Sequence, residues 1–422
     1  MILRLPYGRD TITADLRGLR CRVLEPSAPR VSPDTRSLVG AALDAPVGTA
    51  PLVEQARGRR QVTVLVPDGT RRVPLPVILP ALLARLAAAG VSESAVTVLV
   101  ACGTHPALPA AQLAELLGPL PPAVTVLQHD ARDVATLAPV GALPSGLAVR
   151  LHRAAVEADL LITVSLVAHH YFAGFTGGPK MVFPGVAGYA EIQANHARVI
   201  DVASSPPRRH PGCEPGALDG NPVAEEIALA AALRPPDLAL LLVAGADGRP
   251  AWAIAGPLAA AFPRAAARAR EWYEVEGGSY ARVIASAGGW PTDDTLIQAH
   301  KALDAACRFA APGAEVLFVA ACDGGAGSPD MEPFLADPRP EAIIARLAER
   351  YVQYGQTTLR LVEKTGRFRV SCLSRLDGAL GLRLGLRPVT GVSEVLERWR
   401  ADAAGDTVAV LPGPAVFPRP AS

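Results

Sequence analysis

The sequence predicts an α/β fold made of two α/β domains with largely parallel sheets. Its 422 residues are too many for one ordinary core, because a domain usually contains about 100 to 200 residues. From residue 61 onward, uninterrupted apolar runs of strand length alternate with Ala- and Leu-rich stretches of helical length. Strands that are apolar on both faces are typical of a parallel sheet that helices cover on both sides.

The first two-thirds of the chain contain the clearest repeats of strand, loop and helix. The run QVTVLVPD ends in Asp68 and precedes the turn GTRRVPLP and an amphipathic helix from about Val77 to Ala89. The same order then recurs with other apolar runs. The further elements predicted here are a hairpin over 1–20, a loop and helix over 25–50, strands over 95–105, 124–130 and 159–170, a helix over 222–234, a strand over 238–245 and a long helix through Trp272.

The turn EGGSY at 276–280 marks the predicted domain boundary, because its glycines interrupt the periodic pattern. We expect an N-terminal, ligand-binding domain over 1–275 and a smaller C-terminal α/β domain over 276–422. A helix from Asp293 to Phe309 and the strand AEVLFVAAC belong to the second domain. For the last strand, DTVAVLP, the sequence is compatible with packing on either domain, including back on the first.

The composition argues against nucleic-acid and membrane partners. The formal net charge is +1 and charges of both signs are mixed, so no basic patch for nucleic acid is present. No apolar run approaches the ~18 residues of a membrane helix, and the N-terminus MILRLPYGRD lacks the apolar core of a signal peptide. Six scattered cysteines form no CxxC pair and are expected as free thiols. We therefore expect a cytoplasmic protein.

Polar side chains directly follow three of the predicted strands. Asp68 and Arg71 follow the first, His105 the second, and His169 with His170 the strand that begins near residue 159. Ligands of open parallel sheets bind beyond the carboxyl ends of the strands, so these three loops are expected to converge on one crevice.

Each of these groups also has a simpler interpretation. The turn Asp68-Gly-Thr-Arg71 offers a carboxylate, a hydroxyl and a guanidinium, which suit an anion, but an Asp or Thr there also caps a helix. His105 follows a small-residue turn, and an imidazole with an ordinary pKa of ~6.5 suits a general acid or base near neutral pH. A lone histidine is, however, more often structural.

The segment GFTGGPK places one of only three lysines, Lys180, on a glycine-rich loop. Pro179 and Met181 flank this lysine, which rejects the nucleotide-binding P-loop pattern. The lysine then serves either as a point charge for phosphate or as a site of covalent attachment. His196 follows on the helix GYAEIQANHARVI and is a candidate metal ligand. One histidine cannot form a protein-only metal site, and the sequence shows no carboxylate or thiolate cluster to supply the other ligands. If His196 binds a metal, the remaining ligands must come from a cofactor.

In the second domain, the helix QAHKAL carries Gln298 and Lys301 on adjacent faces. A solvated charge is the ordinary interpretation of a helical lysine. Arginine greatly outnumbers lysine in this chain, however, so a lysine at this position indicates a specific use of its amine.

Four motifs in order, namely DGTR, CGTHP, HHYFAGFTGGPKMVFPGVAGYAEIQANH and QAHK, resemble the nickel-dependent lactate racemase family and its 2-hydroxyacid racemase and epimerase relatives. The resemblance covers roughly residues 1 to 415. It implies a nickel-pincer nucleotide, which is a pyridinium mononucleotide with two sulfur-containing arms (pyridinium-3,5-bisthiocarboxylic acid mononucleotide nickel) tethered to a lysine. One protein histidine completes the nickel coordination, and the active site lies in the cleft between the two domains.

Carried over residue by residue, the resemblance implies a role for each singled-out side chain. The tether falls on Lys180 and the nickel ligand on His196. The remaining roles are acid and base for His105 and His170, cofactor contacts for Asp68, Thr70, Gly177 and Gly178, and substrate contacts for Arg71, Gln298 and Lys301.

The implied reaction inverts the hydroxyl-bearing carbon beside the carboxylate of a 2-hydroxyacid, by proton-coupled hydride transfer to the tethered cofactor. The expected partners are a small-molecule 2-hydroxyacid and cofactor-biosynthesis proteins. Two alternatives are a non-catalytic carrier of the cofactor, which would lack an acid/base histidine, and a zinc hydrolase, which would need three protein ligands. Ile297 occupies a position that is commonly aromatic in the family, so a larger hydroxyacid or a sugar acid is as plausible as lactate.

Overall fold

The computed structural model describes residues 1–70, 72–402, 405–413 and 415–419, and these form two compact units. One unit comprises residues 28–199 and 211–271, and we call it the large unit. The small unit comprises residues 1–27, 200–210 and 272–422. The sequence-based division put residues 1–27 and 200–210 with the first domain. The two assignments differ because strand β3 (Arg20–Val23) pairs with a C-terminal strand, which the sequence pattern does not show.

The large unit contains a six-stranded sheet in the order β15-β14-β9-β4-β5-β6. All neighbours pair in parallel except β14 and β15. The antiparallel edge strand β15 was not among the predicted elements. The strands are β4 (Val62–Pro67), β5 (Val96–Ala101), β6 (Thr125–Gln128), β9 (Leu160–Leu166), β14 (Leu238–Ala244) and β15 (Pro250–Gly256).

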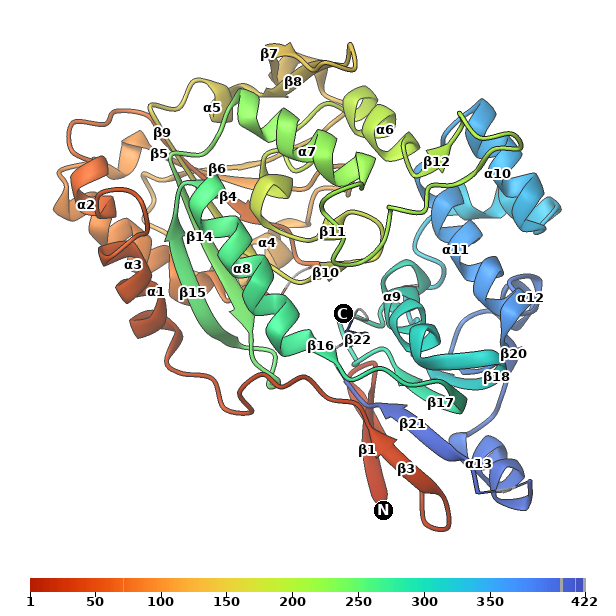
Figure 1. Ribbon diagram of the computed structural model, residues 1–422. Coiled ribbons are helices and arrows are strands. Elements are labelled where there is room, and N and C mark those ends of the chain that lie inside the picture. The colour runs from red at the N-terminus through yellow and green to blue at the C-terminus, as the bar shows by residue number, and fades with distance from the viewer. Residues whose placement is uncertain (71, 403–404, 414, 420–422) are drawn as a thin grey trace. The chain divides into compact units, whose positions relative to one another are not determined.

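Helices cover both faces of this sheet, which explains why its central strands are apolar throughout. One face packs its alternate residues, such as Val64, Val98 and Ile162, against α1 (Thr35–Asp44), α2 (Leu52–Gln55), α3 (Leu75–Ala88) and α4 (Ala110–Leu117). Helices α7 (Pro222–Leu233) and α8 (Leu258–Tyr273) run along the other side of β14 (Figure 1).

The small unit contains a second six-stranded sheet, in the order β20-β19-β18-β17-β21-β3, and all its pairs are parallel. The last predicted strand is β21 (Thr407–Leu411), and it lies between β17 and β3 in this sheet. The other strands are β17 (Tyr280–Ser286), β18 (Ala310–Val319), β19 (Arg369–Leu373) and β20 (Arg387–Pro388).

The hairpin of β1 (Ile2–Tyr7) and β2 (Asp10–Asp15) packs with α13 (Val392–Ala401) on one face of the second sheet. Trp399 anchors this core: its ring is fully buried and its Nε1–H donates to Glu315 Oε2 at 2.7 Å. Helices α9 (Leu296–Ala306), α10 (Pro340–Glu349) and α11 (Gln353–Arg367) also belong to this unit, and α11 was not predicted.

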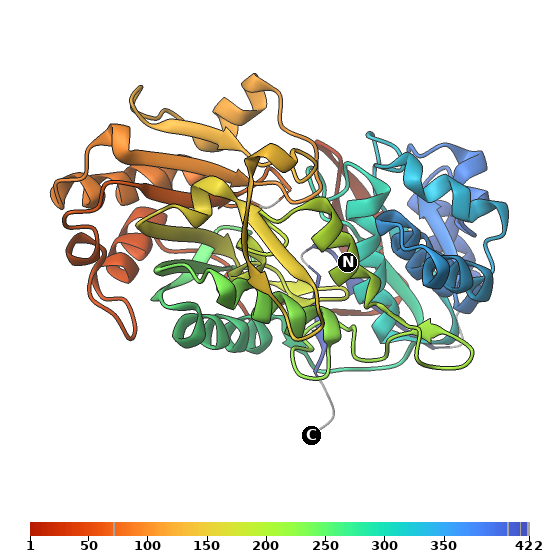
Figure 2. The same cartoon turned by 90° about the horizontal axis from the view of Figure 1, so that it is seen from above.

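Several short two-stranded sheets lie outside the six-stranded ones. Strands β7 (Leu137–Ala142) and β8 (Ala148–His152) form a separate two-stranded sheet (Figures 1 and 2). Strands β12 (Ile200–Asp201) and β13 (Arg208–Arg209) form another. The predicted α/β class with largely parallel sheets is thus confirmed. Among the described residues, no helix has the length and apolar character needed to cross a membrane.

Candidate active site

Three neighbouring strands of the large unit bring the predicted polar residues to one edge of the sheet. Strand β4 lies between β9 and β5, and all three run parallel. Asp68 and Thr70 follow β4, His105 follows β5, and His170 lies in β10 (His169–His170), directly after β9. The three loops therefore follow the carboxyl ends of three neighbouring parallel strands, as expected.

Asp68 and His105 form a hydrogen bond between two of these loops. His105 Nδ1 lies 2.6 Å from Asp68 Oδ2, and the carboxylate is buried while the imidazole is 33% exposed. The other carboxylate oxygen, Oδ1, accepts from the Thr70 amide at 3.1 Å and from the Thr70 hydroxyl at 2.5 Å. An ionised carboxylate only accepts hydrogen bonds, so it holds the proton of a neutral His105 on Nδ1. The Nε2 lone pair is then available to take a proton.

The loop that carries His105 is fixed on both sides of the histidine. The Gly103 amide donates to the carbonyl of Gly185 at 2.9 Å. Leu108 exchanges two hydrogen bonds with the Gln128 side chain, at 2.8 and 3.0 Å. Because Gly185 in turn donates its amide to the Lys180 carbonyl at 3.0 Å, the His105 loop and the Lys180 loop are tied together.

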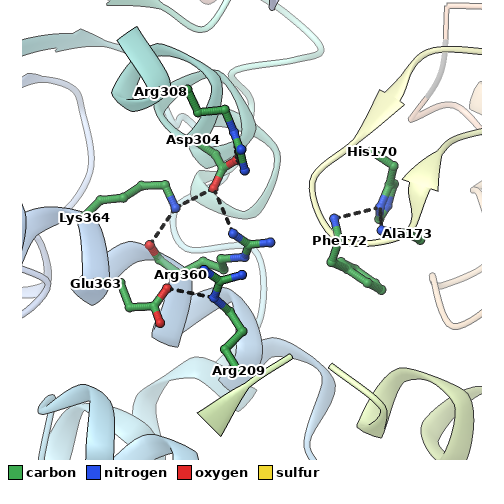
Figure 3. A network of polar contacts seen from close by, with 9 residues as sticks. All are labelled: His170, Phe172, Ala173, Arg209, Asp304, Arg308, Arg360, Glu363 and Lys364. Carbon is green, nitrogen blue, oxygen red and sulfur yellow. Dashed lines mark hydrogen bonds and ion pairs between the residues drawn. The ribbon is translucent and has the colours of Figure 1, made fainter. Parts of the chain in front are cut away.

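His170 is buried, and its Nδ1 faces hydrogen-bond donors, whereas Nδ1 of His105 faces an acceptor. The backbone amides of Ala173 and Phe172 point at His170 Nδ1, at 3.2 and 3.5 Å (Figure 3). A nitrogen that faces N–H donors must accept, so a neutral His170 carries its proton on Nε2. His105 is thus arranged to accept a proton through Nε2 and His170 to donate from Nε2.

The glycine loop is explained by packing against protein atoms. Gly177 has φ +67°, and a Cβ there would lie 2.5 Å from the carbonyl oxygen of Leu166. Gly178 has φ +55°, and a Cβ would overlap the ring of Phe262. Both φ values lie in the left-handed region that favours glycine, so the two residues are required by the fold itself. They start the short 3-10 turn η3 (Gly178–Met181), which carries Lys180.

Lys180, His170 and His196 surround one aromatic ring, that of Phe172. The Lys180 ammonium lies 5.5 Å from the ring centroid, and the rings of His170 and His196 meet it edge-on at 4.7 and 5.2 Å. Phe172 itself is buried. The sequence analysis did not single out Phe172, although it follows the histidine pair directly in HHYF.

His196 projects from α6 (Tyr189–Ala197) and is 6% exposed. Burial lowers its pKa to about 3, the nearby charge of Lys180 contributes in the same direction, and a hydrogen bond with the Ile192 backbone opposes them. The imidazole is therefore neutral at pH 7, which is the form that binds metals. Throughout the described part of the chain, no group of three His, Cys, Asp or Glu residues is arranged to hold a metal ion.

The predicted substrate-binding residues are Arg71, Gln298 and Lys301. Arg71 lies outside the described residues. In the small unit, α9 carries Gln298 and Lys301, and the Lys301 ammonium donates to Gln298 Oε1 at 2.6 Å. The adjacent His300 is buried and its Nδ1 lies 2.7 Å from the Ile297 carbonyl oxygen, so its own helix holds this ring.

Comparison with known proteins identifies the family. A family model for the lactate racemase N-terminal domain matches residues 7–206. A lactate racemase from Lactiplantibacillus plantarum is 30% identical over 337 residues, which are 79% of this chain and 78% of that protein. The chain belongs to the lactate racemase family.

Further comparisons extend the similarity to most or all of the chain. A lactate racemase from Thermoanaerobacterium thermosaccharolyticum is 28% identical over 355 residues, 82% of this chain and 81% of that protein. The structure of a lactate racemase apoprotein from the same organism superimposes with a TM-score of 0.88 at 25% identity and covers all of both chains. A Thermotoga maritima protein with a TM-score of 0.71 and 18% identity, covering 94% of this chain and 99% of its own, shares the fold. The family predicted from the four motifs is confirmed.

Proposed function

We propose that this member of the lactate racemase family is a racemase or epimerase that inverts the hydroxyl-bearing carbon of a 2-hydroxyacid. The family relatives, which are named lactate racemases, support an isomerase acting on a hydroxy acid. The observation that carries the proposal is the pair of buried or half-buried histidines that follow β5 and β9, His105 and His170, held as opposite tautomers. A reaction that must serve both enantiomers needs one group that accepts a proton and one that donates it.

The residues of the large unit fit a nickel-pincer nucleotide. Lys180 supplies the amine for attachment, and His196 is a neutral buried imidazole close to it. Among the described residues, no group of three or more His, Cys, Asp or Glu side chains is placed to hold a metal ion. A metal at His196 therefore requires further ligands from a cofactor, and a pincer nucleotide would supply three ligand atoms. When bound at Lys180 and His196, this group would supply a hydride acceptor and donor for the hydrogen on the substrate carbon.

His105 acts on the substrate hydroxyl in this scheme. Its Nε2 takes the hydroxyl proton while the carboxylate of Asp68 stabilises the imidazolium that results. Thr70 holds that carboxylate in place through Oδ1. We therefore propose that Asp68 and Thr70 position His105, in place of the cofactor contact that the resemblance implied for them.

His170 serves the opposite enantiomer. In the neutral ring, its Nε2–H is placed to donate a hydrogen bond to the substrate oxygen and to stabilise negative charge that develops there. Transfer of that proton to the oxygen requires the ring to be an imidazolium, which becomes neutral in the step. We propose Arg71, Gln298 and Lys301 as groups that hold the substrate carboxylate or hydroxyls, because guanidinium, ammonium and amide groups match those acceptors. Partners of the chain under this proposal are the enzymes that make and load the cofactor.

Intact mass tests the tether. The chain produced together with the cofactor-making enzymes is expected to exceed its sequence mass, and Lys180→Arg to lose the excess because a guanidinium keeps the charge but not the attachment chemistry. Lys301→Arg is the matched control and keeps the excess mass. Retention of the added mass by Lys180→Arg rejects the assignment.

A deuterated substrate tests the reaction. The holoenzyme is expected to racemise a 2-deuterated hydroxyacid with a primary isotope effect and without loss of deuterium to water, because the hydrogen returns from the cofactor. Washout of the label into water argues for direct proton abstraction instead. A fully loaded chain that turns over no 2-hydroxyacid, from lactate to larger sugar acids, supports the cofactor-carrier alternative.

A further inference from the structure

We propose that Asn195 and Glu226 are positioning residues that fix the tautomer of His196 and thereby direct its Nε2 to a metal. His196 Nδ1 lies 3.2 Å from Asn195 Oδ1, and the Asn195 amide nitrogen donates to Glu226 Oε2 at 3.1 Å. Both supporting side chains are buried, Asn195 completely. The metal-binding part of this inference rests on the proposed function, whereas the tautomer does not.

The surroundings of Asn195 force the orientation of its side-chain amide. Its Nδ2 faces two groups, the carbonyl oxygen of Val223 at 3.2 Å and the carboxylate of Glu226. A carbonyl and an ionised carboxylate accept hydrogen bonds and cannot donate them. The amide –NH₂ must therefore occupy this side, and a flipped amide would place its oxygen against two other oxygens. Asn195 Oδ1 is consequently left to face His196.

Glu226 is ionised because several donors converge on it. Arg198 Nη2 lies 2.7 Å from Oε1, and the Ser145 hydroxyl donates to the same oxygen at 2.7 Å. Burial by itself raises the pKa of this carboxyl, but the hydrogen bonds from Arg198, Ser145 and Asn195 outweigh it and the pKa is lowered. The carboxylate is thus an acceptor at neutral pH, as the amide orientation requires.

The consequence for His196 follows from the direction of each hydrogen bond. Since Asn195 Oδ1 can only accept, a neutral His196 must carry its proton on Nδ1. The lone pair is then on Nε2, which is the nitrogen that a metal takes when Nδ1 donates to an oxygen. The order Glu226, Asn195, His196 resembles the carboxylate and carbonyl supports that orient histidine ligands in other metalloproteins.

The neighbourhood of residue 195 also explains why this residue is an asparagine, although carboxylates are common partners of metal-binding histidines. An aspartate at residue 195 would bring a second carboxylate to about hydrogen-bond distance from Glu226, without a proton between them. Asparagine avoids this repulsion between two carboxylates, because its amide donates to Glu226 and accepts from His196 at the same time. The two side chains are therefore matched, and their chemistry can be exchanged only as a pair.

The first test is the tautomer in the apoprotein, measured by long-range ¹H–¹⁵N correlation of histidine-labelled protein, with His196→Gln to assign the signal. The wild-type chain is expected to show Nδ1–H at His196. Asn195→Ala is expected to weaken this preference, because the Ile192 backbone then remains as a hydrogen-bond partner of the ring. Asn195→Asp combined with Glu226→Gln is expected to strengthen it again, since the glutamine amide donates to the new carboxylate, but only in part, because the Val223 carbonyl oxygen loses its donor. A wild-type His196 protonated on Nε2 overturns the proposal.

The second test is retention of nickel by the holoenzyme against a chelator. Asn195→Ala is expected to lose nickel roughly 10- to 100-fold faster, as for other residues that orient metal ligands, with its tethered mass unchanged. The double variant is expected to lose nickel more slowly than Asn195→Ala, and Gln193→Ala, a control on the same helix, to retain nickel like the wild type. Equal retention by Asn195→Ala overturns the positioning role.

The outcomes separate this inference from the proposed function. A wild-type chain that acquires neither added mass nor nickel contradicts the proposed function and, with it, the metal-binding part of the inference, while the tautomer measurement still stands. Circular dichroism and thermal unfolding report whether each variant folds. If Asn195→Ala does not fold, the wild-type tautomer decides the question, and a His196 protonated on Nε2 overturns the proposal.

Discussion

Asp68 Oδ2 and His105 Nδ1 lie 2.6 Å apart, and the same carboxylate receives both hydrogen bonds of Thr70 on its other oxygen. This arrangement makes the carboxylate an acceptor on both sides. One of the Thr70 donors is a backbone N–H, which no side-chain substitution removes. The side-chain atom of residue 68 that faces it must therefore be an acceptor.

Asp68→Asn is therefore expected to set the wrong tautomer of His105 in a folded protein. The amide oxygen must face the Thr70 N–H, so the amide –NH₂ faces His105 Nδ1 and moves the ring proton to Nε2. Turnover by the loaded enzyme should fall by roughly 10²- to 10⁴-fold, the range that general acid–base catalysis contributes. Steady-state kinetics measure this, and nickel content should not change. Asp133→Asn, which alters a cap at the exposed turn 133–136, should keep full turnover.

Gly177→Ala is expected to destabilise the large unit more than Gly58→Ala. Both residues have a positive φ, +67° and +74°, so both substitutions cost about 1–2 kcal/mol of left-handed strain. Only at Gly177 would the added Cβ meet another group, the Leu166 carbonyl oxygen at 2.5 Å, whereas nothing lies within 4 Å at Gly58.

Urea unfolding of both glycine variants measures the difference. The excess loss at Gly177 isolates the steric clash, because the backbone strain is common to the two sites. Equal losses at the two positions would mean that the loop after β9 moves aside, and that crowding does not explain its glycines.

The sequence predicted most strands and the positions of the candidate residues, because buried parallel strands are continuous apolar runs and their ends are marked by polar residues. It could not predict that β3 pairs with β21, since nothing local to residues 20–23 names a partner almost 400 residues away. It missed the antiparallel strand β15, whose run PAWAIAG is less apolar than the central strands.

Partnerships between candidate residues were harder to predict than the residues themselves. Asp68 and His105 were both identified, but their contact depends on the adjacency of β4 and β5. Asn195 and Glu226 carry no motif of their own, and their relation emerges only where α6 lies against α7. The cofactor contacts assigned to Gly177 and Gly178 stay a prediction; what the sequence could not show is that Leu166 and Phe262 occupy the space where a Cβ would lie.

The buried ion pair of Asp304 and Lys364 is expected to contribute strongly to the stability of the small unit. Lys364 Nζ lies 2.5 Å from Asp304 Oδ1, and Arg308 and Arg360 approach the same carboxylate at 3.2 and 3.7 Å (Figure 3). Lys364→Met leaves a buried carboxylate with less compensation and should cost about 3–5 kcal/mol of unfolding free energy. Arg17→Ala is the matched control: its pair with Asp15 is similarly short, at 2.6 Å, but exposed, so its removal should leave the free energy of unfolding almost unchanged.

The pH dependence of the Asp304 contribution has a defined sign. Burial raises the pKa of this carboxyl, but Lys364, Arg360 and Arg308 outweigh burial and lower it below its usual range. A carboxyl with a lowered folded pKa stabilises the fold above its unfolded pKa of ~3.9 and loses that contribution as the pH falls further. Urea unfolding should therefore show the deficit of Asp304→Asn in full at pH 7 and a smaller one below pH ~4. A deficit that is constant with pH would contradict a charged Asp304.

His129 is expected to make the large unit less stable in mild acid. The ring is buried, its Nε2 lies 2.9 Å from the Ala187 carbonyl oxygen, and burial lowers its pKa to about 4, with the nearby His152 acting in the same direction. The unfolded chain takes up a proton near pH ~6.5 and the folded chain only near pH 4, so the unfolded state binds more protons between these values. Stability should then fall by about 1.4 kcal/mol per pH unit for this group as the pH decreases through that window.

His129→Gln isolates this effect, because an amide can still donate to the Ala187 carbonyl but does not titrate. Urea unfolding at pH 8 gives the cost of the substitution itself, since His129 is neutral in both states there. At pH 5 the variant should have regained about 2 kcal/mol relative to the wild type, which is the part of the window already crossed. The same difference at both pH values would show that His129 is not kept neutral by the fold.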